Sequence, residues 1–365
     1  MSVIVVAPDS FKGSASAAAV ASALAEGWRS VRPDDELVLA PMADGGEGTL
    51  DAFAVAAPGA VRHPVRVLGP DGSAVDASWL QLPDGTAVVE LAETSGLGLM
   101  RELAPFDAHT VGFGQAIAAA LDAGASALLL AIGGSASTDG GAGMLSALGA
   151  RFLDADGRQV PTGNRGLSVL ERVDLGRLRP LPAGGARILS DVTSPLLGPS
   201  GAAAVFGPQK GATPADIPLL EEGLRRLAEA LAGERPVSPD ENGAGAAGGT
   251  GFGLLAWGAR MAPGAVAVGE ALGLPAAITR ADAVITGEGR YDSQSAAGKV
   301  PAYVAKLARS SGVPLLLVAG AVEAPTDGFA DAVALAALAG SREAAIADPL
   351  HWAFAAGTSL ARRVG

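Results

Sequence analysis

The chain has 365 residues, of which 49% are hydrophobic and 4% aromatic, so two domains with helix-rich, Ala-rich cores are expected. Its 38 acidic and 26 basic residues give a net charge of −12, which disfavours nonspecific binding to nucleic acid or to anionic membranes. The absence of cysteine excludes disulfides and thiol chemistry, and three histidines leave little room for a His-rich metal cluster.

The amino-terminal segment predicts a strand followed by a helix. VIVVAP at 3–8 is a continuous β-branched run, typical of a strand covered on both faces, and the apolar residues after it share one helical face. No basic segment precedes this run, unlike in a signal peptide, and no apolar run is long enough to cross a bilayer. We therefore expect a soluble, cytoplasmic protein.

A second strand and helix follow, and then the pattern changes. LVLAP at 37–41 predicts a strand before the loop MADGGEG and a helix around TLDAFAVAA. From about residue 61, three strand-like runs are separated by GPDG and LPDG, which are turn sequences between antiparallel strands. A different domain is therefore expected to begin near residue 61.

Helical and strand signals alternate up to residue 280. A strand–helix pattern then resumes with AVITG at 283–287. We therefore expect residues 1–60 and 281–365 to build one doubly wound α/β domain, with residues 61–280 inserted as a second domain. The alternative is two consecutive domains divided near 234–251, a stretch whose Pro and Gly content is typical of a linker.

Polar residues follow the predicted strands, where ligands bind in open α/β sheets. Each is expected in a loop directly after a strand. The residues and segments concerned are Asp9, Asp44, Glu47, the loop GGSASTDGGAG at 133–143, Asp191 and Glu288. The repetition of this arrangement at five strand ends indicates an enzyme site.

The sequence resembles the bacterial glycerate kinases of the two-domain type. The matching blocks are APDSFKGSASA from Ala7, PMADGGEGT from Pro41, ETSGL from Glu93, GGSASTDGGAGML from Gly133, DVTSPLLGP from Asp191, VFGPQKGA from Val205, GAGAAGGTG from Gly243 and TGEGRYDSQSAAGKVP from Thr286. They span almost the whole chain in the family's order. Thr138 and Ser194 depart from the family, which usually has Asn at both positions, so the neighbouring Asp139 and Asp191 are stronger candidates for direct substrate contacts.

This resemblance implies a flavodoxin-like doubly wound parallel-sheet domain made from both chain ends, and a large inserted mixed α/β domain. The active site would lie in the cleft between them. It further implies ATP and Mg²⁺, and phosphorylation of D-glycerate, most often at the 2-hydroxyl to give 2-phosphoglycerate.

The first group of candidate residues lies near the amino terminus. No GxxxxGK[ST] loop is present, so we expect Lys12 to meet an anion at the start of the first helix, next to a substrate contact at Ser10. Asp9 is a candidate metal ligand or general base. Asp44 and Glu47 are expected to bind metal, because the glycines around them allow a ligand to approach closely.

The second group lies in the middle of the chain. Backbone N–H groups of the glycine-rich loop are expected to hold a nucleotide phosphate or the glycerate carboxylate. The residues assigned to this role are Gly133, Gly134, Ser135, Asp139 and Gly140. Asp191 is a candidate metal ligand or catalytic base, and Lys210 is expected to face the anionic substrate.

The third group follows the strand at 283–287. Arg290 is expected to bind the anionic substrate, while Glu288 and Asp292 are spaced so that both can reach one Mg²⁺. Gly287 and Lys299 are expected to bind phosphate. The general base is left open among Asp9, Asp191 and Asp292. The three histidines, His63, His109 and His351, are not spaced as metal ligands.

The predicted function is therefore an ATP- and Mg²⁺-dependent kinase that phosphorylates D-glycerate by direct in-line transfer. A related small hydroxy acid as acceptor, or 3-phosphoglycerate as product, is the nearer alternative. A hydroxy-acid dehydrogenase is poorly supported, because no GxGxxG follows the first strand. A noncatalytic sugar-acid or nucleotide-binding regulator is the remaining alternative. We expect no nucleic-acid or membrane partner, and a monomer or homodimer.

Overall fold

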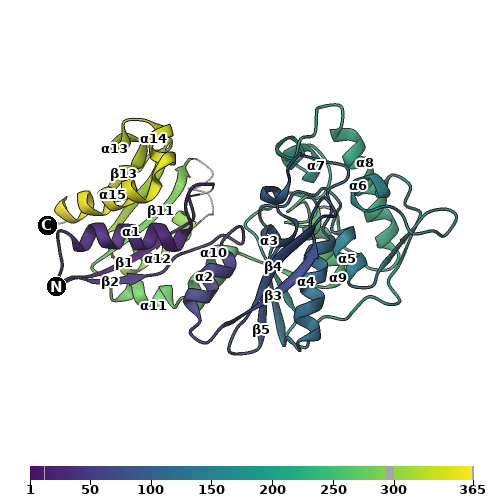
Figure 1. Cartoon of the computed structure of the whole chain (residues 1–365), viewed down its shortest axis with the longest axis horizontal. Coiled ribbons are helices and arrows are strands. Elements are labelled where there is room, and N and C mark those ends of the chain that lie inside the picture. The colour runs from purple at the N-terminus through teal and green to yellow at the C-terminus, as the bar shows by residue number, and fades with distance from the viewer. Residues whose placement is uncertain (12, 293–299, 364–365) are drawn as a thin grey trace. The chain divides into compact units, whose positions relative to one another are not determined.

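A computed structural model of the chain describes residues 1–11, 13–292 and 300–363 (Figure 1). The chain divides into two compact units, each made from more than one segment. Unit 1 contains Met1–Asp44, Asp51–Pro58 and the chain from Gly264 onward, and unit 2 contains Gly45–Leu50 and Gly59–Pro263.

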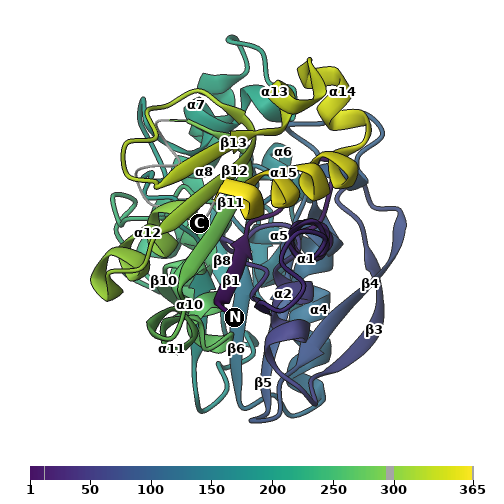
Figure 2. The same ribbon diagram turned by 90° about the vertical axis from the view of Figure 1, so that its left-hand side faces the viewer.

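Unit 1 is built on a five-stranded sheet whose neighbouring strands are all parallel. The strands are β1 (Val3–Pro8), β2 (Glu36–Leu39), β11 (Ala283–Tyr291), β12 (Leu315–Val322) and β13 (Asp331–Ala334). Their spatial order is β13-β12-β11-β1-β2, and Figure 2 shows β1 beside β11. Renumbered within this sheet the order is 2-1-3-4-5, so the predicted flavodoxin-like, doubly wound fold is confirmed.

The helices of unit 1 are α1 (Ala17–Arg29), most of α2 (Thr49–Ala56), α10 (Gly264–Ala271), α11 (Leu274–Thr279), α12 (Val300–Ser311), α13 (Leu335–Ala339), α14 (Arg342–Ala347) and α15 (Pro349–Arg363). Ser16 caps α1, since its side chain accepts a hydrogen bond from the Ala19 amide at 3.2 Å. Helices α1 and α15 run side by side (Figure 1), and a Cβ at Gly27 would lie 2.0 Å from the Phe354 carbonyl oxygen. Glycine is therefore required for this close approach.

Unit 2 contains a mixed six-stranded sheet in the order β10-β9-β6-β5-β4-β3. Its strands are β3 (Val61–Leu68), β4 (Ala74–Gln81), β5 (Thr86–Glu90), β6 (Ala127–Ala131), β9 (Ala186–Leu189) and β10 (Arg260–Ala262). The first three pair antiparallel through the turns that GPDG and LPDG predict, and β5, β6, β9 and β10 pair in parallel. A two-stranded sheet joins β7 (Arg151–Leu153) to β8 (Arg172–Asp174).

The helices of unit 2 are α3 (Leu91–Ser95), α4 (Val111–Asp122), α5 (Ala142–Ala147), α6 (Gly163–Leu167), α7 (Ala202–Phe206), α8 (Ile217–Ala232) and α9 (Thr250–Trp257), with short 3₁₀ turns at Leu97–Leu99 and Pro208–Lys210. Helix α8 shows how the sequence selects the buried face. Leu220, Leu224, Leu227 and Leu231 recur at helical spacing and are all fully buried in the unit's core. In the described ranges, no helix has the length and apolar character needed to cross a bilayer.

The unit boundaries differ from the expected residues 61 and 281. The last passage of the chain from unit 2 to unit 1 lies at Pro263–Gly264 and not near residue 281, because α10 and α11 pack with α12 in unit 1. Residues 45–50 group with unit 2, since the Gly133 amide donates to the Gly45 carbonyl at 2.9 Å. The stretch 234–251, considered above as a linker, lies inside unit 2.

Candidate functional site

A polar cluster lies at the carboxyl ends of β1 and β11 in unit 1. Asp9 directly follows β1 and is only 3% exposed, and its amide donates to the Gly287 carbonyl at 2.8 Å. The Asp9 carboxylate accepts the Ser10 amide at 2.7 Å. These two strands flank the point where the strand order reverses, which is where doubly wound sheets bind their ligands.

Two residues expected in a loop lie within strand β11. Glu288 pairs with Ala319 of β12, and Arg290 pairs with Ala321. The loop prediction was wrong here because the pairing with β12 continues past AVITG, and this partner strand is not visible in the local sequence. Gly287 is also in the strand, and a Cβ there would lie 2.0 Å from the Val318 carbonyl oxygen.

The carboxylates of this cluster line a pocket of about 300 Å³. Its polar lining residues include Asp9, Ser10, Glu288, Arg290 and Asp292. Glu288 is buried, whereas Arg290 is exposed and ion-paired with Glu323 through an Nη2–Oε2 contact of 2.5 Å. The structure thus brings five residues predicted for the site into one cavity.

The pocket's carboxylates suit a magnesium ion that is also bound by phosphate. In the ranges 1–11, 13–292 and 300–363, no group of three or more His, Asp or Glu side chains is arranged to hold a metal ion. Mg²⁺ is usually bound by one or two carboxylates together with waters and substrate phosphates. Asp9, Glu288 and Asp292 provide oxygen ligands of the required kind around one cavity.

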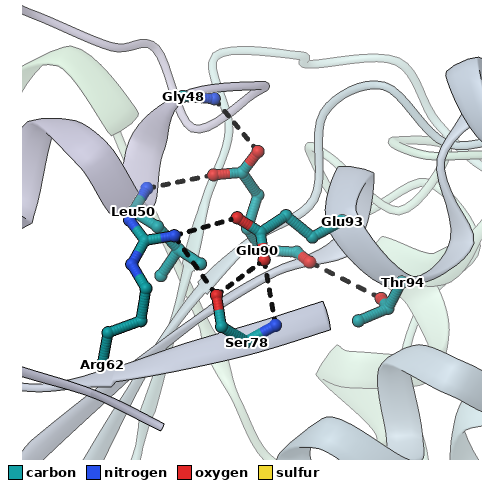
Figure 3. Close-up of polar contacts among 7 residues, drawn as sticks. All are labelled: Gly48, Leu50, Arg62, Ser78, Glu90, Glu93 and Thr94. Carbon is teal, nitrogen blue, oxygen red and sulfur yellow. Dashed lines mark hydrogen bonds and ion pairs between the residues drawn. The ribbon is translucent and has the colours of Figure 1, made fainter. Parts of the chain in front are cut away.

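Glu90, which the sequence analysis did not single out, organises the second acidic loop. It ends β5 in unit 2 and is 2% exposed. Its two carboxylate oxygens accept the amides of Gly48 and Leu50, each at 3.0 Å, as Figure 3 shows. A carboxylate therefore already satisfies the N–H groups at the start of α2, and it fixes the loop that carries Glu47.

A neighbouring group of hydrogen bonds holds the helix after β5 in place. Glu93 accepts the amide of Ser78 at 3.0 Å and its hydroxyl at 2.9 Å (Figure 3). Arg62 donates to Glu93 at 3.3 Å and to the Ser78 hydroxyl at 3.2 Å. These contacts tie β3 and β4 to α3, so the motif ETSGL begins with a structural carboxylate.

We expect Glu90→Gln to destabilise the protein by about 1–3 kcal/mol, because the amide NH₂ cannot accept one of the two backbone hydrogen bonds. Urea unfolding followed by circular dichroism measures this change. Glu102→Gln is the matched control, since Glu102 is an exposed residue of the same unit. An unchanged unfolding midpoint for Glu90→Gln would contradict the assigned role.

The glycine-rich loop after β6 makes many of its contacts inside unit 2. The amides of Gly133 and Gly140 donate to the carbonyls of Gly45 and Gly248, at 2.9 and 3.1 Å. A Cβ at Gly133 would lie 2.5 Å from the Gly46 Cα, so glycine is needed for the two loops to touch. The Ser135 hydroxyl is buried and lies 3.2 Å from that of Ser137.

Asp139 is fully buried and receives four hydrogen bonds. Its donors are the Thr110 amide at 2.9 Å, the Thr110 hydroxyl at 2.8 Å, and the amides of Gly141 and Gly143, each at 3.1 Å. These bonds join the loop to the starts of α4 and α5. Asp139 therefore holds the loop in shape from within.

Lys210 is 2% exposed, and its ammonium donates to the Ser137 carbonyl. Burial lowers the pKa of Lys210 from the ordinary 10.5 to about 7, although the Asp139 carboxylate opposes the shift. A Cβ at Gly248 would lie 2.7 Å from the same nitrogen, so the ammonium is closely surrounded. The structure places Lys210 in the interior beside the glycine-rich loop.

This burial predicts a pH-dependent stability. Between pH 7 and 10.5 the Lys210 amine is protonated in the unfolded chain and neutral in the folded protein. The free energy of unfolding therefore increases as the pH is raised through this range, and the increase is lost when the pH is lowered to about 7. From pH 7 to 8.5 the wild type is expected to gain up to about 2 kcal/mol relative to Lys210→Met. Urea titrations of both proteins at several pH values measure the difference, and parallel curves would refute it.

The remaining predicted residues are distributed as follows. Asp44 is half-buried in unit 1, while Glu47 is exposed in unit 2. Asp191 is half-buried two residues after the end of β9 in unit 2, and Gly134 is exposed. Lys12 and Lys299 lie outside the described residues.

Two residues of interest were missed by the sequence analysis. Glu90 carries the same signal as Asp9, a carboxylate at the end of a buried apolar strand, so the rule used for Asp9 could have found it. Arg342 lines the pocket of unit 1 from α14, and no local motif marks it.

Comparison with known proteins gives consistent matches over most of the chain. A family model described as the glycerate kinase family matches residues 4–364. The glycerate 2-kinase of Escherichia coli K12 is 45% identical over 325 residues, which cover 87% of this chain and 85% of that protein. The glycerate kinase of Bacillus subtilis 168 is 44% identical over 330 residues, with 87% and 85% covered.

A solved structure matches over the whole chain. The crystal structure of a proposed glycerate kinase 2 from Salmonella typhimurium LT2 has a TM-score of 0.85 and 40% sequence identity. The match covers 100% of this chain and 98% of that chain.

Proposed function

The chain belongs to the glycerate kinase family and is a phosphotransferase, and from this premise we propose that it transfers the γ-phosphoryl group of ATP to D-glycerate. The transfer would require Mg²⁺, proceed in line without a phosphoenzyme, and give mainly 2-phosphoglycerate. The name of the Escherichia coli relative favours the 2-position.

The observation that carries this proposal is the pocket at the strand-order reversal of unit 1. Three carboxylates, a serine hydroxyl and an arginine line one cavity there: Asp9, Glu288, Asp292, Ser10 and Arg290. Phosphoryl transfer needs oxygen ligands for a metal ion, cations for the phosphate oxygens, and a carboxylate that accepts the acceptor's proton. This residue set supplies all three.

Each residue then has a definite task. Asp9 is the strongest candidate to accept the hydroxyl proton, because its oxygens lie at the end of β1 on the pocket wall. Glu288 and Asp292 would hold Mg²⁺, which when bound neutralises charge on the transferring phosphoryl group. Arg290, which is ion-paired with Glu323 and lies 3.7 Å from Asp292, would contact a carboxylate or phosphate of the substrates.

The other predicted site residues lie in unit 2 or at its border and stay part of the proposal. Asp44, Glu47 and Asp191 would contribute metal ligands or a base, and the loop at Gly133, Gly134 and Ser135 would bind the acceptor carboxylate or a phosphate. Glu90 would then position Glu47, because it accepts hydrogen bonds from the Gly48 and Leu50 amides of the same loop.

Phosphorus NMR tests the proposal directly. Purified protein is incubated with ATP, Mg²⁺ and D-glycerate, and the product is identified as 2- or 3-phosphoglycerate. Omission of Mg²⁺ should abolish turnover, and no stable phosphorylated protein should accumulate. Exclusive formation of 3-phosphoglycerate would contradict the proposed position of phosphorylation. A strong preference for another hydroxy acid would contradict the proposed acceptor. ATP binding without turnover of any hydroxy acid would refute the kinase itself.

A further inference from the structure

The pocket of unit 1 has a second wall that the chemistry described above does not use. This wall is apolar and is formed mainly by the carboxyl-terminal helices, with Phe11, Leu335, Ala345, Ile346 and Pro349 lining the cavity. Ile346 is 53% exposed even though it is a large apolar side chain. The cavity is therefore polar where β1 and β11 end and apolar where α13, α14 and α15 meet it.

A three-carbon acid does not match this second wall. D-glycerate carries an oxygen on every carbon and has little apolar surface to bury, and it would fill only a small part of a cavity of about 300 Å³. Small-molecule sites of this size combine an apolar lining with a few polar groups that fix orientation. A nucleotide has the complementary form, with a flat aromatic base at one end and phosphates at the other.

Arg342 supplies the cation that such a ligand needs on this side. It lines the pocket from the first turn of α14, and it makes no ion pair with any carboxylate of the described residues. Arg290, by contrast, is engaged by Glu323. Phosphates placed beside the carboxylates of this pocket are repelled by them, so a cation on the facing wall lowers the cost of binding.

We propose that the apolar wall around Ile346 binds the base of the nucleotide donor and that Arg342 contacts its phosphate chain. The base would lie against Ile346 and Pro349, and the phosphates would extend toward Asp9 and Glu288. This inference rests on the proposed function, since it names the binding site of that reaction's donor substrate.

Calorimetric titration of the full chain with ADP and with adenosine separates the two contacts. Ile346→Asp places a charge against the base and is expected to weaken ADP and adenosine binding roughly tenfold or more. Arg342→Gln is expected to weaken ADP binding roughly fivefold while leaving adenosine binding within twofold, because adenosine carries no phosphate. The KM for ATP should rise in parallel, and the KM for D-glycerate should stay within twofold.

Leu350→Asp is the matched control. Leu350 is 39% exposed and lies in the first turn of α15, four residues after Ile346 in the sequence, but it does not line the pocket. This variant should bind ADP as the wild type does. Equal loss of ADP affinity in the Leu350 and Ile346 variants would overturn the proposal, since a general surface effect would then explain both.

Two further outcomes are decisive. Unchanged ADP affinity in Ile346→Asp, with a raised KM for D-glycerate, would assign the pocket to the acceptor and overturn the inference. Wild-type protein that binds ADP through Ile346 and Arg342 but phosphorylates no hydroxy acid would uphold the nucleotide site and refute the proposed function instead.

Discussion

Replacing Asp9 by Asn is expected to lower kcat for glycerate phosphorylation by about 10²- to 10⁴-fold, the range typical for loss of a positioned acid–base group. The asparagine can still accept the Ser10 amide hydrogen bond through its carbonyl oxygen, so the turn after β1 should be preserved. Steady-state kinetics at saturating ATP, Mg²⁺ and D-glycerate measure the effect.

A control and a second readout make this result specific. Asp282→Asn changes an exposed Asp at the amino end of β11, where its carboxylate accepts the Val3 amide at 2.8 Å, and kcat should stay within twofold. If Asp9 acts as the base, kcat of the variant stays low at any Mg²⁺ concentration. If it binds the metal, excess Mg²⁺ restores part of the activity. If the Asp9→Asn variant turned over substrate at the wild-type rate, Asp9 would have no catalytic or metal-binding role.

Replacing Asp139 by Ala is expected to destabilise the protein by about 3–5 kcal/mol. The change leaves the buried donors of Thr110, Gly141 and Gly143 without their acceptor, and it removes the carboxylate that faces the Lys210 ammonium. The pKa of Lys210 should fall further, because Asp139 is the charge that raises it. Chemical denaturation followed by circular dichroism gives the free energy of unfolding.

Asp156→Ala serves as the comparison for this experiment. Asp156 is an exposed residue of unit 2 that pairs with Arg158 on the surface, and exposed ion pairs contribute about 0–1 kcal/mol. A loss below 1 kcal/mol for Asp139→Ala would mean that its hydrogen bonds are replaced by water, and the buried network described here would then be incorrect.

The sequence correctly predicted those strands and turns whose formation depends on residues close together in the chain. The β-branched run at 3–8 forms β1, and GPDG and LPDG form the turns that join β3, β4 and β5. The placement of Asp9 beyond a strand that is buried on both faces also followed from sequence, because the strand's end was visible in the residues themselves. These features require no knowledge of distant segments.

Features that depend on tertiary contacts were not accessible in this way. Glu288 was expected in a loop, but β12 extends the pairing of β11 past it. Nothing local indicates that α10 and α11 pack with α12 rather than with the middle of the chain. Tertiary packing overrides local signals at both places.

The candidate site shows the same division. The strand-end rule pointed to Asp9 and Glu288, and the structure places both on one pocket with Arg290 and Asp292, although Glu288 lies inside β11 and not after it. The rule could not show that Lys210 is enclosed, because its burial depends on the loop at Ser137 and on Gly248, which are far away in sequence. Arg342 escaped notice for a similar reason, since it reaches the pocket from the carboxyl-terminal helices.

The pairing of β1 with β11 bears on how the protein is made. Thr286 donates to the Ala7 carbonyl across 279 residues of sequence, and β1 has β2 as its only neighbour until β11 emerges from the ribosome. At a synthesis rate of about 5–20 residues per second, the nascent VIVVAP segment waits many seconds for its partner. An apolar strand with an open edge can pair with another chain, so we expect the translation speed of the intervening segment to affect the yield of native protein.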